Sequence, residues 1–302
     1  MRPQQPTAAR HNHQDTTINP ASEEAFFTMS LLFVDTEKCK RDGICAAVCP
    51  PRIIAWKTKD DIPQMAPGGD ELCIRCGHCV AVCPHGAMNH ENMRAEDCPP
   101  VQGGWLPDPE QTEHFLRNRR SIRVYKDTPV ERDTLVRLIE IARYAPSGHN
   151  LQPVRWKIIY DREDVSRISG HVIDWMRSLI AEKSPLAELL HMDRAVYAWE
   201  NGVDPINRNA PHLVMAHGHQ EDRTAQTAST IALSYLELAT AGFSLGACWA
   251  GYFTAAALFW PPLQEFLALP EKHSCCGALM IGHPKFRYHR LPLRNEPEIT
   301  WL

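Results

Sequence analysis

The 302-residue sequence lacks several features that define common protein classes. No apolar run is long enough to span a bilayer, so a membrane-spanning protein is not expected. The net charge of −4 gives no basic excess, which argues against nucleic acid or an anionic membrane as a partner. The C-terminal two thirds has no Gly-x-Gly-x-x-Gly motif, so a Rossmann-type nicotinamide site is not indicated.

A secretory signal is not expected either. Residues 25–34 are apolar, but two glutamates precede them where basic residues would be required, and the segment continues directly into polar sequence. We interpret it as the first strand of a small domain. Residues 1–30 are otherwise polar and without periodicity, which predicts a disordered tail. Met29 is an alternative to Met1 as the translation start.

Cysteine is abundant, with 11 residues, and most of them fall in two runs. The second run has the spacing with which bacterial ferredoxins bind a cubane iron–sulfur cluster, and a proline follows its last cysteine: Cys73, Cys76, Cys79 and Cys83. The first run is a degenerate copy in which Asp42 stands where a second cysteine would be: Cys39, Cys45 and Cys49. The two runs predict two clusters and one-electron transfer.

In two-cluster ferredoxins the fourth cysteine of each run ligates the other cluster. This assigns one cluster to Cys73, Cys76, Cys79 and Cys49, and the other to Cys39, Cys45, Cys83 and the Asp42 position. Zinc is the alternative, because paired cysteines also bind zinc, but the number of cysteines and the two Cys-Pro endings favour iron and sulfur. Thiolates kept for iron imply a reducing compartment, and we expect a cytoplasmic protein.

Asp42 leaves several outcomes open. A carboxylate is a harder ligand than a thiolate and holds iron less tightly in a sulfur-rich site. The first cluster could therefore be a four-iron cluster ligated by Asp42, a four-iron cluster with water at that corner, or a three-iron cluster. Asp42-Gly43 is also a good turn dipeptide, so a purely local role is the alternative.

Composition divides the chain into four parts. The tail at 1–30 is followed by the iron–sulfur domain at 31–98, a linker at 99–110 and a larger domain at 111–302. The proline and glycine content of the linker predicts a tether without regular structure.

The larger domain has mixed helical and strand patterns, so the predicted fold class is α+β. Thr128 and Glu131 predict a capping box at the start of a helix that ends near Pro146. Strands are expected at 154–160, 213–216 and 278–281, and helices at 172–182, 186–191 and about 224–242.

Three segments of this domain indicate a phosphate-bearing aromatic cofactor. Residues 119–123 (Arg-Arg-Ser-Ile-Arg) offer forked cationic donors and a hydroxyl, which suit a phosphate. Small and amide residues at 146–153 can hydrogen-bond a planar heterocycle. The small residues of 246–251 let the backbone approach a ring face. Taken alone, residues 119–123 are also compatible with a solvated basic turn, and residues 146–153 with a connector.

In this order, together with 283–290, the segments resemble the nitroreductase family of FMN enzymes over about residues 110–302. The resemblance implies a mixed sheet flanked by helices and an intertwined homodimer with FMN at its interface. A preceding ferredoxin-like domain with two [4Fe–4S] clusters is a known arrangement. The implied FMN contacts are Arg119, Arg120, Ser121, Arg123, Ser147, Asn150, Gln152, Ala250, Gly251 and Arg290. Many family members carry an acidic residue near flavin N5, where this chain has Ala250.

The combined pattern is typical of an FMN-dependent oxidoreductase whose clusters relay electrons to or from the flavin. The substrate would be a small electron-poor molecule (a nitro compound, quinone or enone), and the donor NAD(P)H or a ferredoxin-type protein. Flavin N5 would perform the chemistry, so no side chain is assigned as catalytic. Two alternatives stay open: a flavoenzyme reduced by NAD(P)H with the clusters as electron outlet, and a redox carrier or sensor without turnover. The arginines favour an enzyme, since they have no evident purpose without a phosphate.

Overall fold

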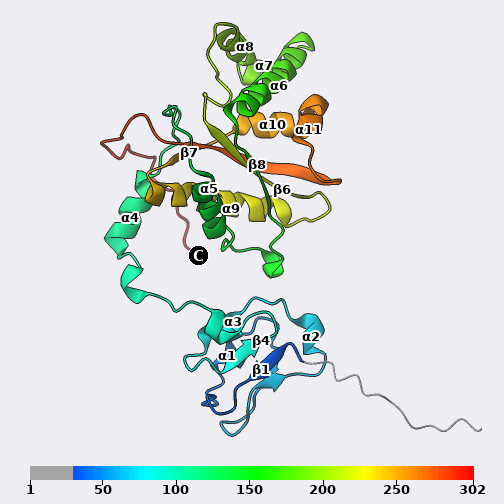
Figure 1. Ribbon diagram of the computed structural model, residues 1–302, viewed down its shortest axis with the longest axis vertical. Coiled ribbons are helices and arrows are strands. Elements are labelled where there is room, and N and C mark those ends of the chain that lie inside the picture. The colour runs from blue at the N-terminus through cyan, green and yellow to red at the C-terminus, as the bar shows by residue number, and fades with distance from the viewer. Residues whose placement is uncertain (1–29) are drawn as a thin grey trace, which may run out of the picture. The chain divides into compact units, whose positions relative to one another are not determined.

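The computed structural model describes residues 30–302, which form two compact units (Figure 1). One unit comprises residues 30–72 together with Gly77–Cys98, and the other comprises Cys73–Cys76 and Pro99–Leu302. The expected tail and the choice between Met1 and Met29 as translation start lie outside the described residues.

The first unit contains two short antiparallel ribbons. β1 (Leu32–Val34) pairs with β4 (Met88–His90), and β2 (Ile54–Ala55) pairs with β3 (Gln64–Met65). Short helical segments complete the unit: α1 (Ile44–Ala47), α2 (Gly69–Leu72), α3 (His78–Val82) and η1 (Ala95–Asp97). Its small core includes both ligand-bearing helices, because Cys45 of α1 and Val80 of α3 are buried in it.

The second unit begins with helical structure inside the predicted linker, so the expectation of an irregular tether at 99–110 is wrong in part. η2 (Gly103–Trp105) is followed by α4 (Pro109–Asn118). Asp108 caps α4 by accepting the Gln111 N–H at 2.7 Å, and the Gln111 side chain accepts the Asp108 N–H at 3.2 Å. Proline at the first helical position needs no N–H partner there, so Pro109 starts the helix instead of breaking it.

A four-stranded sheet forms the centre of the second unit, in the order β5-β6-β8-β7. Its strands are β5 (Arg155–Ile159), β6 (His212–His219), β8 (His273–Gly282) and β7 (Gly246–Trp249). Every neighbouring pair runs antiparallel, so the expected mixed sheet is corrected in this detail. Continuous apolar strands such as β6 are typical of parallel sheets, but here helices bury both faces of an antiparallel sheet.

Alternate residues along β6 enter two separate cores. Leu213 and Met215 pack on the side of α6 (Arg162–Ala181) and α10 (Gly251–Phe259). Val214 and Ala216 pack on the side of α5 (Arg132–Ala142) and α9 (Ala225–Ala239). The predicted sheet flanked by helices is therefore confirmed (Figure 1). The remaining helical segments are η3 (Gly148–Asn150), α7 (Pro185–Leu189), α8 (Met192–Glu200), η4 (Thr240–Phe243) and α11 (Pro261–Leu267).

The predicted capping box at Thr128 is wrong, because α5 begins only at Arg132 and the side chain of its N-cap residue, Glu131, makes no capping hydrogen bond. A tertiary contact explains the later start. The N–H of Val130, a buried residue, donates to Nε2 of His212 on β6 at 2.8 Å. This bond holds the segment before α5 against the sheet. Within the described part of the chain, no helix has both the length and the apolar character needed to cross a bilayer.

Candidate cofactor sites

Cys45, the second cysteine of the first run, is buried in α1. Burial raises the pKa of the Cys45 thiol, and the neighbouring Cys83, Asp42 and Cys39 raise that pKa further. A backbone hydrogen bond from Ala46 opposes this shift. These neighbours are the ligands that the crosswise ferredoxin pattern assigns to one cluster. The mutual repulsion of such acidic groups is what a positively charged metal centre would relieve.

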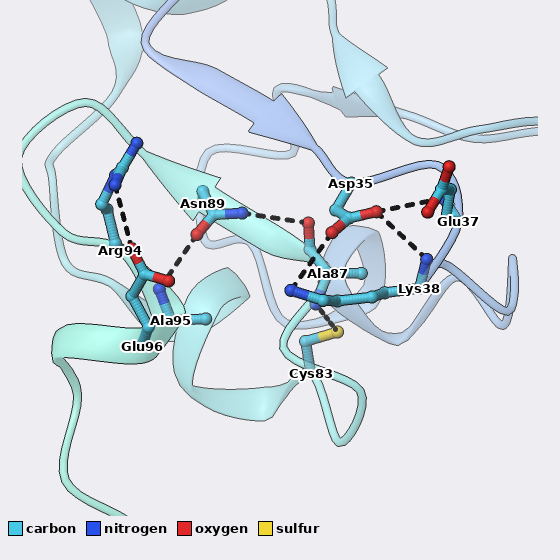
Figure 2. A network of polar contacts seen from close by, with 9 residues as sticks. All are labelled: Asp35, Glu37, Lys38, Cys83, Ala87, Asn89, Arg94, Ala95 and Glu96. Atoms are coloured by element: carbon cyan, nitrogen blue, oxygen red, sulfur yellow. Dashed lines mark hydrogen bonds and ion pairs between the residues drawn. The ribbon is translucent and has the colours of Figure 1, made fainter.

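Cys83 lies directly after α3 and accepts a hydrogen bond through sulfur. The N–H of Ala87 donates to Cys83 Sγ at 3.3 Å. Figure 2 shows that Asn89 fixes this donor: its Nδ2 donates to the carbonyl of Ala87 at 3.2 Å, and its Oδ1 accepts the Ala95 N–H at 3.0 Å. Hydrogen bonds from backbone N–H groups to sulfur are common at cysteines that ligate iron–sulfur clusters.

Asp42 is exposed and takes part in the turn before α1. Its Oδ1 accepts the Ile44 N–H at 3.3 Å, so the local role proposed from the Asp-Gly dipeptide is present. The same carboxylate acts electrostatically on Cys45. Both properties fit a residue beside the open corner of a cluster.

All cysteines of the two runs are buried or half-buried. Among residues 30–302, no three His, Cys, Asp or Glu side chains converge closely enough to hold one metal ion. Cys49, Cys79 and Cys83 instead pack partly buried around the same core as Cys45. Cys73 and Cys76 are half-buried. The cysteine spacing, which fits a cubane cluster, favours iron and sulfur over zinc.

A cavity of about 860 Å³ lies in the second unit, lined by the end of α4, the end of α9, β7 and residues 284–291. Arg119, Arg120 and Arg290, separated by most of the domain in sequence, all line it. Further cationic side chains join them, namely Lys126, Lys285 and Arg287, whereas Glu237 is the acid among the lining residues. The cavity is therefore suited to an anion.

Arg120 gives the clearest sign of a missing partner. Its Nε is buried and has no hydrogen-bond partner among the described residues. A buried guanidinium nitrogen without an acceptor is costly, and a phosphate oxygen would satisfy it. The residues present thus fit the phosphate that the Arg-Arg-Ser-Ile-Arg segment predicts.

The other residues of that segment lie differently. Ile122 lines the cavity and its N–H donates to the carbonyl of Ala247 at 2.9 Å, which joins the segment to β7. Ser121 is half-buried and Arg123 is exposed, and neither belongs to the cavity lining. Their assignment to FMN stays a prediction.

The loop with Ser147, Asn150 and Gln152 has an unusual backbone. His149, Asn150 and Gln152 have positive φ values of 50°, 55° and 49°. The hydroxyl of Ser147 accepts the Gln152 N–H at 3.0 Å and so holds the loop closed. Strained backbone of this kind concentrates at ligand-binding sites, and the flavin contacts of this loop stay a prediction.

The loop and the cavity belong to opposite ends of α9. A Cβ on Gly148 would lie 3.3 Å from the side chain of Thr224, the residue before α9, whereas Glu237 near its other end lines the cavity. At about 1.5 Å per residue these ends are separated by about 20 Å. Within one chain, the loop therefore does not join the arginines at the phosphate.

Ala250 and Gly251 form the junction between β7 and α10. Ala250 is buried and its N–H donates to the carbonyl of Ala278 at 3.0 Å. At Gly251, no described atom lies within 4 Å of the position that a Cβ would take. The backbone at this residue is thus open, and its contact with a flavin ring stays a prediction.

Glu237 is the residue that the sequence analysis missed. Its Oε1 accepts from Arg119 Nη1 at 2.9 Å, and its Oε2 accepts from Trp249 Nε1 at 3.0 Å. An acid beside Leu233 and Leu236 on the buried face of a helix was the available signal, because such a charge is rarely buried without a partner.

Residues 116–283 match the model of the nitroreductase family, which is more than half of the chain. The chain belongs to this family. Residues 37–87 match the model of a 4Fe–4S dicluster domain. The nitroreductase match thus covers Arg119, Arg120 and Glu237 of the cavity lining, and the dicluster match spans both cysteine runs.

Known proteins with similar sequence or structure agree with this membership. An NADH dehydrogenase of Thermus thermophilus is 28% identical over 199 residues, which cover 61% of this chain and 92% of the relative. A putative NADH dehydrogenase/NAD(P)H nitroreductase of Streptomyces coelicolor is 26% identical over 190 residues, or 62% of this chain and 91% of the relative. The fold is similar to that of a nitroreductase with bound FMN from Bacteroides fragilis, with a TM-score of 0.54 and 17% identity over 64% of this chain and 98% of that one.

Proposed function

We propose that the protein is an FMN-dependent oxidoreductase in which two iron–sulfur clusters relay electrons to or from the flavin. Its substrate would be a small electron-poor molecule such as a nitro compound, a quinone or an enone. When bound, FMN exchanges one or two electrons with its partners and the clusters exchange single electrons. The protein contributes binding, orientation and electrostatics.

The observation that supports FMN most directly is the unpaired Nε of Arg120 inside a cationic cavity of a nitroreductase-family domain. The Bacteroides fragilis protein of similar fold binds FMN. In this chain Arg119, Arg120 and Arg290 would hold the phosphate, because guanidinium groups form charge-assisted hydrogen bonds with phosphate oxygens. Ser121 and Arg123 would contribute to the phosphate and ribityl chain from the same segment.

The ring of the flavin would lie against the open backbone at Gly251. Asn150 and Gln152 belong to the other end of α9, so we propose that they reach the flavin from a second copy of the chain in a homodimer. Their strained loop, closed by Ser147, would then present amide groups to the flavin at a fixed position. A molecular mass near twice 34.2 kDa in sedimentation equilibrium is the expected result, and a monomer that binds FMN would contradict it.

In the iron–sulfur module, the residues that would hold one cluster are Cys39, Cys45, Cys83 and the Asp42 position. Cys73, Cys76, Cys79 and Cys49 would hold the other. Burial of Cys45 limits access of water to its sulfur, and the Ala87 N–H offers a hydrogen bond to the sulfur of Cys83. Hydrogen bonds to ligating sulfurs and low solvent exposure both tune the reduction potential of a cluster.

A second candidate differs in how the flavin is reduced. The relatives from Thermus thermophilus and Streptomyces coelicolor have names that refer to NADH or NAD(P)H. This supports a flavin reduced directly by a nicotinamide, with the clusters as electron outlet. In this alternative the iron–sulfur module passes electrons on to a protein acceptor.

An anaerobic spectral titration of the reconstituted protein separates these candidates. NADH, NADPH or a chemically reduced ferredoxin is added, and the flavin and iron–sulfur absorbance are followed together. Reduction of both chromophores by ferredoxin alone supports the relay to the flavin. Reduction of the flavin by NAD(P)H, followed by the clusters, supports the second candidate.

The matched controls use variants that lack one part each. Arg120→Ala is expected to lose flavin absorbance and keep the iron–sulfur absorbance. Cys76→Ser is expected to keep the flavin absorbance and lose the absorbance of one cluster. A protein purified with full iron content that takes up no flavin from excess FMN would contradict the proposal and leave an electron carrier.

A further inference from the structure

Glu237 is a buried charged residue near the C-terminal end of α9. Its side chain is 8% exposed, whereas its partner Arg119 is 33% exposed. Burying a carboxylate is costly unless each oxygen has a hydrogen-bond donor. Both oxygens of Glu237 are satisfied, one by Arg119 and the other by the indole N–H of Trp249.

The two partners come from segments with different expected tasks. Arg119 ends α4 and begins the predicted phosphate segment. Trp249 is the last residue of β7 and directly precedes Ala250 and Gly251, where the flavin ring is expected. Arg119 and Trp249 are 130 residues apart in sequence. Among the described residues, Glu237 is the side chain that hydrogen-bonds to both of them.

From this bridge we infer that Glu237 is a positioning residue that selects a phosphorylated flavin. It orients the Arg119 guanidinium toward the phosphate position and holds the indole of Trp249 beside the ring-binding backbone. The inference rests on the proposed function, because it concerns the FMN site of this domain. Glu237 acts through its two partners, without contact to the phosphate itself.

Removing the charge of Glu237 is expected to change the FMN affinity in a direction that distinguishes a positioning role from a purely electrostatic one. By electrostatics alone, neutralising an acid in a cationic cavity would strengthen the binding of an anion. If Glu237 positions Arg119, the same change releases the guanidinium from its place and weakens binding. The Glu237→Gln variant keeps the shape and one acceptor oxygen, which can still accept from Trp249, but loses the charge-assisted bond to Arg119.

The test is a calorimetric titration of the flavin-stripped, iron–sulfur-loaded protein with FMN and with riboflavin, which lacks the phosphate. For Glu237→Gln we expect the Kd for FMN to rise roughly tenfold, as for loss of one oriented charge-assisted bond, and the Kd for riboflavin to change less than about twofold. Glu271→Gln removes an exposed charge elsewhere and is expected to leave both values as in the wild type.

A double-mutant cycle checks that Glu237 acts through Arg119. In an Arg119→Ala background, Glu237→Gln is expected to weaken FMN binding by less than about twofold further, because the group that it positions is already absent. If Glu237→Gln does not fold, Glu237→Asp keeps the charge but shortens the side chain, and the same preferential loss of FMN over riboflavin is expected.

Three results would overturn the inference: tighter or unchanged FMN binding by Glu237→Gln, equal losses for FMN and riboflavin, and full additivity with Arg119→Ala. Each of them differs from failure of the proposed function, in which the wild-type protein itself takes up no FMN. The wild-type titration therefore tests the proposed function. The ratio of the Kd values of Glu237→Gln and the wild type, for FMN and for riboflavin, tests the role of Glu237.

Discussion

Asp42 and Cys76 occupy equivalent backbone positions in the two cysteine runs. Each is preceded by an arginine of positive φ (55° and 51°) and followed by a glycine with nearly the same backbone angles, φ 74° and ψ 2° at Gly43, and φ 73° and ψ 2° at Gly77. Directly after these glycines start the helices α1 and α3. The two runs thus share one local fold, and the side chain at this position is what distinguishes them.

Asp42→Cys is expected to convert the first site into a four-cysteine site. The backbone already has the shape found at Cys76, so the new thiol needs no rearrangement to point as its counterpart does. We expect about eight irons per chain, as two cubanes require, and slower loss of iron to a chelator than in the wild type. Iron analysis and EPR of the reduced protein measure this.

Asp42→Ser is the control for this substitution, because a hydroxyl keeps the acceptor for the Ile44 N–H but is a poor iron ligand. It is expected to lower iron retention or leave it unchanged. An identical iron content and EPR spectrum in Asp42→Cys and the wild type would show that Asp42 is not at a cluster corner and acts only in the turn before α1.

Cys76→Ser is expected to remove one cluster while FMN stays bound. Serine is a harder ligand than a thiolate, so the cluster assigned to Cys73, Cys76, Cys79 and Cys49 should lose iron. The flavin contacts that we propose are on other segments. Iron and flavin content of the purified protein are measured together, and about half of the iron should be lost.

Cys98→Ser provides the matched control, since Cys98 lies outside both runs and its Sγ donates to the carbonyl of Arg94 at 3.3 Å. Its iron content is expected to equal that of the wild type. Full iron in Cys76→Ser, or the same loss in Cys98→Ser, would refute the ligand assignment.

Local chemistry explains what the sequence revealed. The spacing of cysteines within a run reflects ligand geometry inside a few residues, and the family resemblance located Arg119, Arg120 and Arg290, which meet at one cavity. Strands at 154–160, 213–216 and 278–281 also agree with β5, β6 and β8, because their apolar pattern follows directly from burial.

Long-range contacts explain what the sequence did not reveal. The late start of α5 depends on a hydrogen bond from Val130 to His212, 82 residues away, and no local capping signal reports it. The antiparallel order of the sheet is hidden because strands buried on both faces look alike in either direction. The role of Glu237 depends on two partners from separate segments, although its place among leucines was a visible anomaly.

Arg120→Ala is expected to weaken FMN binding more than Arg123→Ala does. Arg120 lines the cavity and has a buried Nε without a partner among the described residues, whereas Arg123 is exposed and outside the lining. Loss of charge-assisted bonds from Arg120 should raise the Kd for FMN roughly ten- to a hundredfold. Arg123→Ala tests the assignment made from the sequence, with a smaller loss expected. Equal affinity of Arg120→Ala and wild type would remove Arg120 from the phosphate site.

Protonation of His212 is expected to destabilise the fold in mild acid. Burial lowers the pKa of His212, whose Nε2 accepts from Val130 and whose Nδ1 lies 2.7 Å from the carbonyl of Tyr160. Below about pH 6.5 the unfolded chain binds a proton that the folded chain resists, so the free energy of unfolding falls as the pH falls. His212→Gln keeps an acceptor but does not titrate.

The measurement is the midpoint of urea unfolding at about pH 7.5 and about pH 5.5. The wild type is expected to lose more stability between these pH values than His212→Gln. The difference between the urea midpoints of the two proteins should therefore be smaller at the lower pH. His219→Gln, on the same strand, is the control and should follow the wild type. The same difference between the urea midpoints at both pH values would mean that His212 does not contribute to the loss of stability in acid.

Gly246→Ala is expected to destabilise the nitroreductase domain where β7 meets the phosphate segment. A Cβ at Gly246 would lie 2.3 Å from Cγ1 and 2.9 Å from Cβ of Ile122, a buried residue whose N–H is bonded to β7. Those atoms are near the backbone and cannot swing away, so the segment itself must shift. Overpacking of this kind costs about 1–3 kcal/mol.

Gly242→Ala is the matched control, because no described atom lies within 4 Å of the Cβ that it would add. We expect a change within about 0.5 kcal/mol for this variant, against a fall in melting temperature of a few degrees for Gly246→Ala, about 2–4 °C per kcal/mol in a domain of this size. Circular dichroism melts of both variants measure the difference. If Gly246→Ala melted like Gly242→Ala, Ile122 and the arginines beside it would have to be more mobile than their packing indicates.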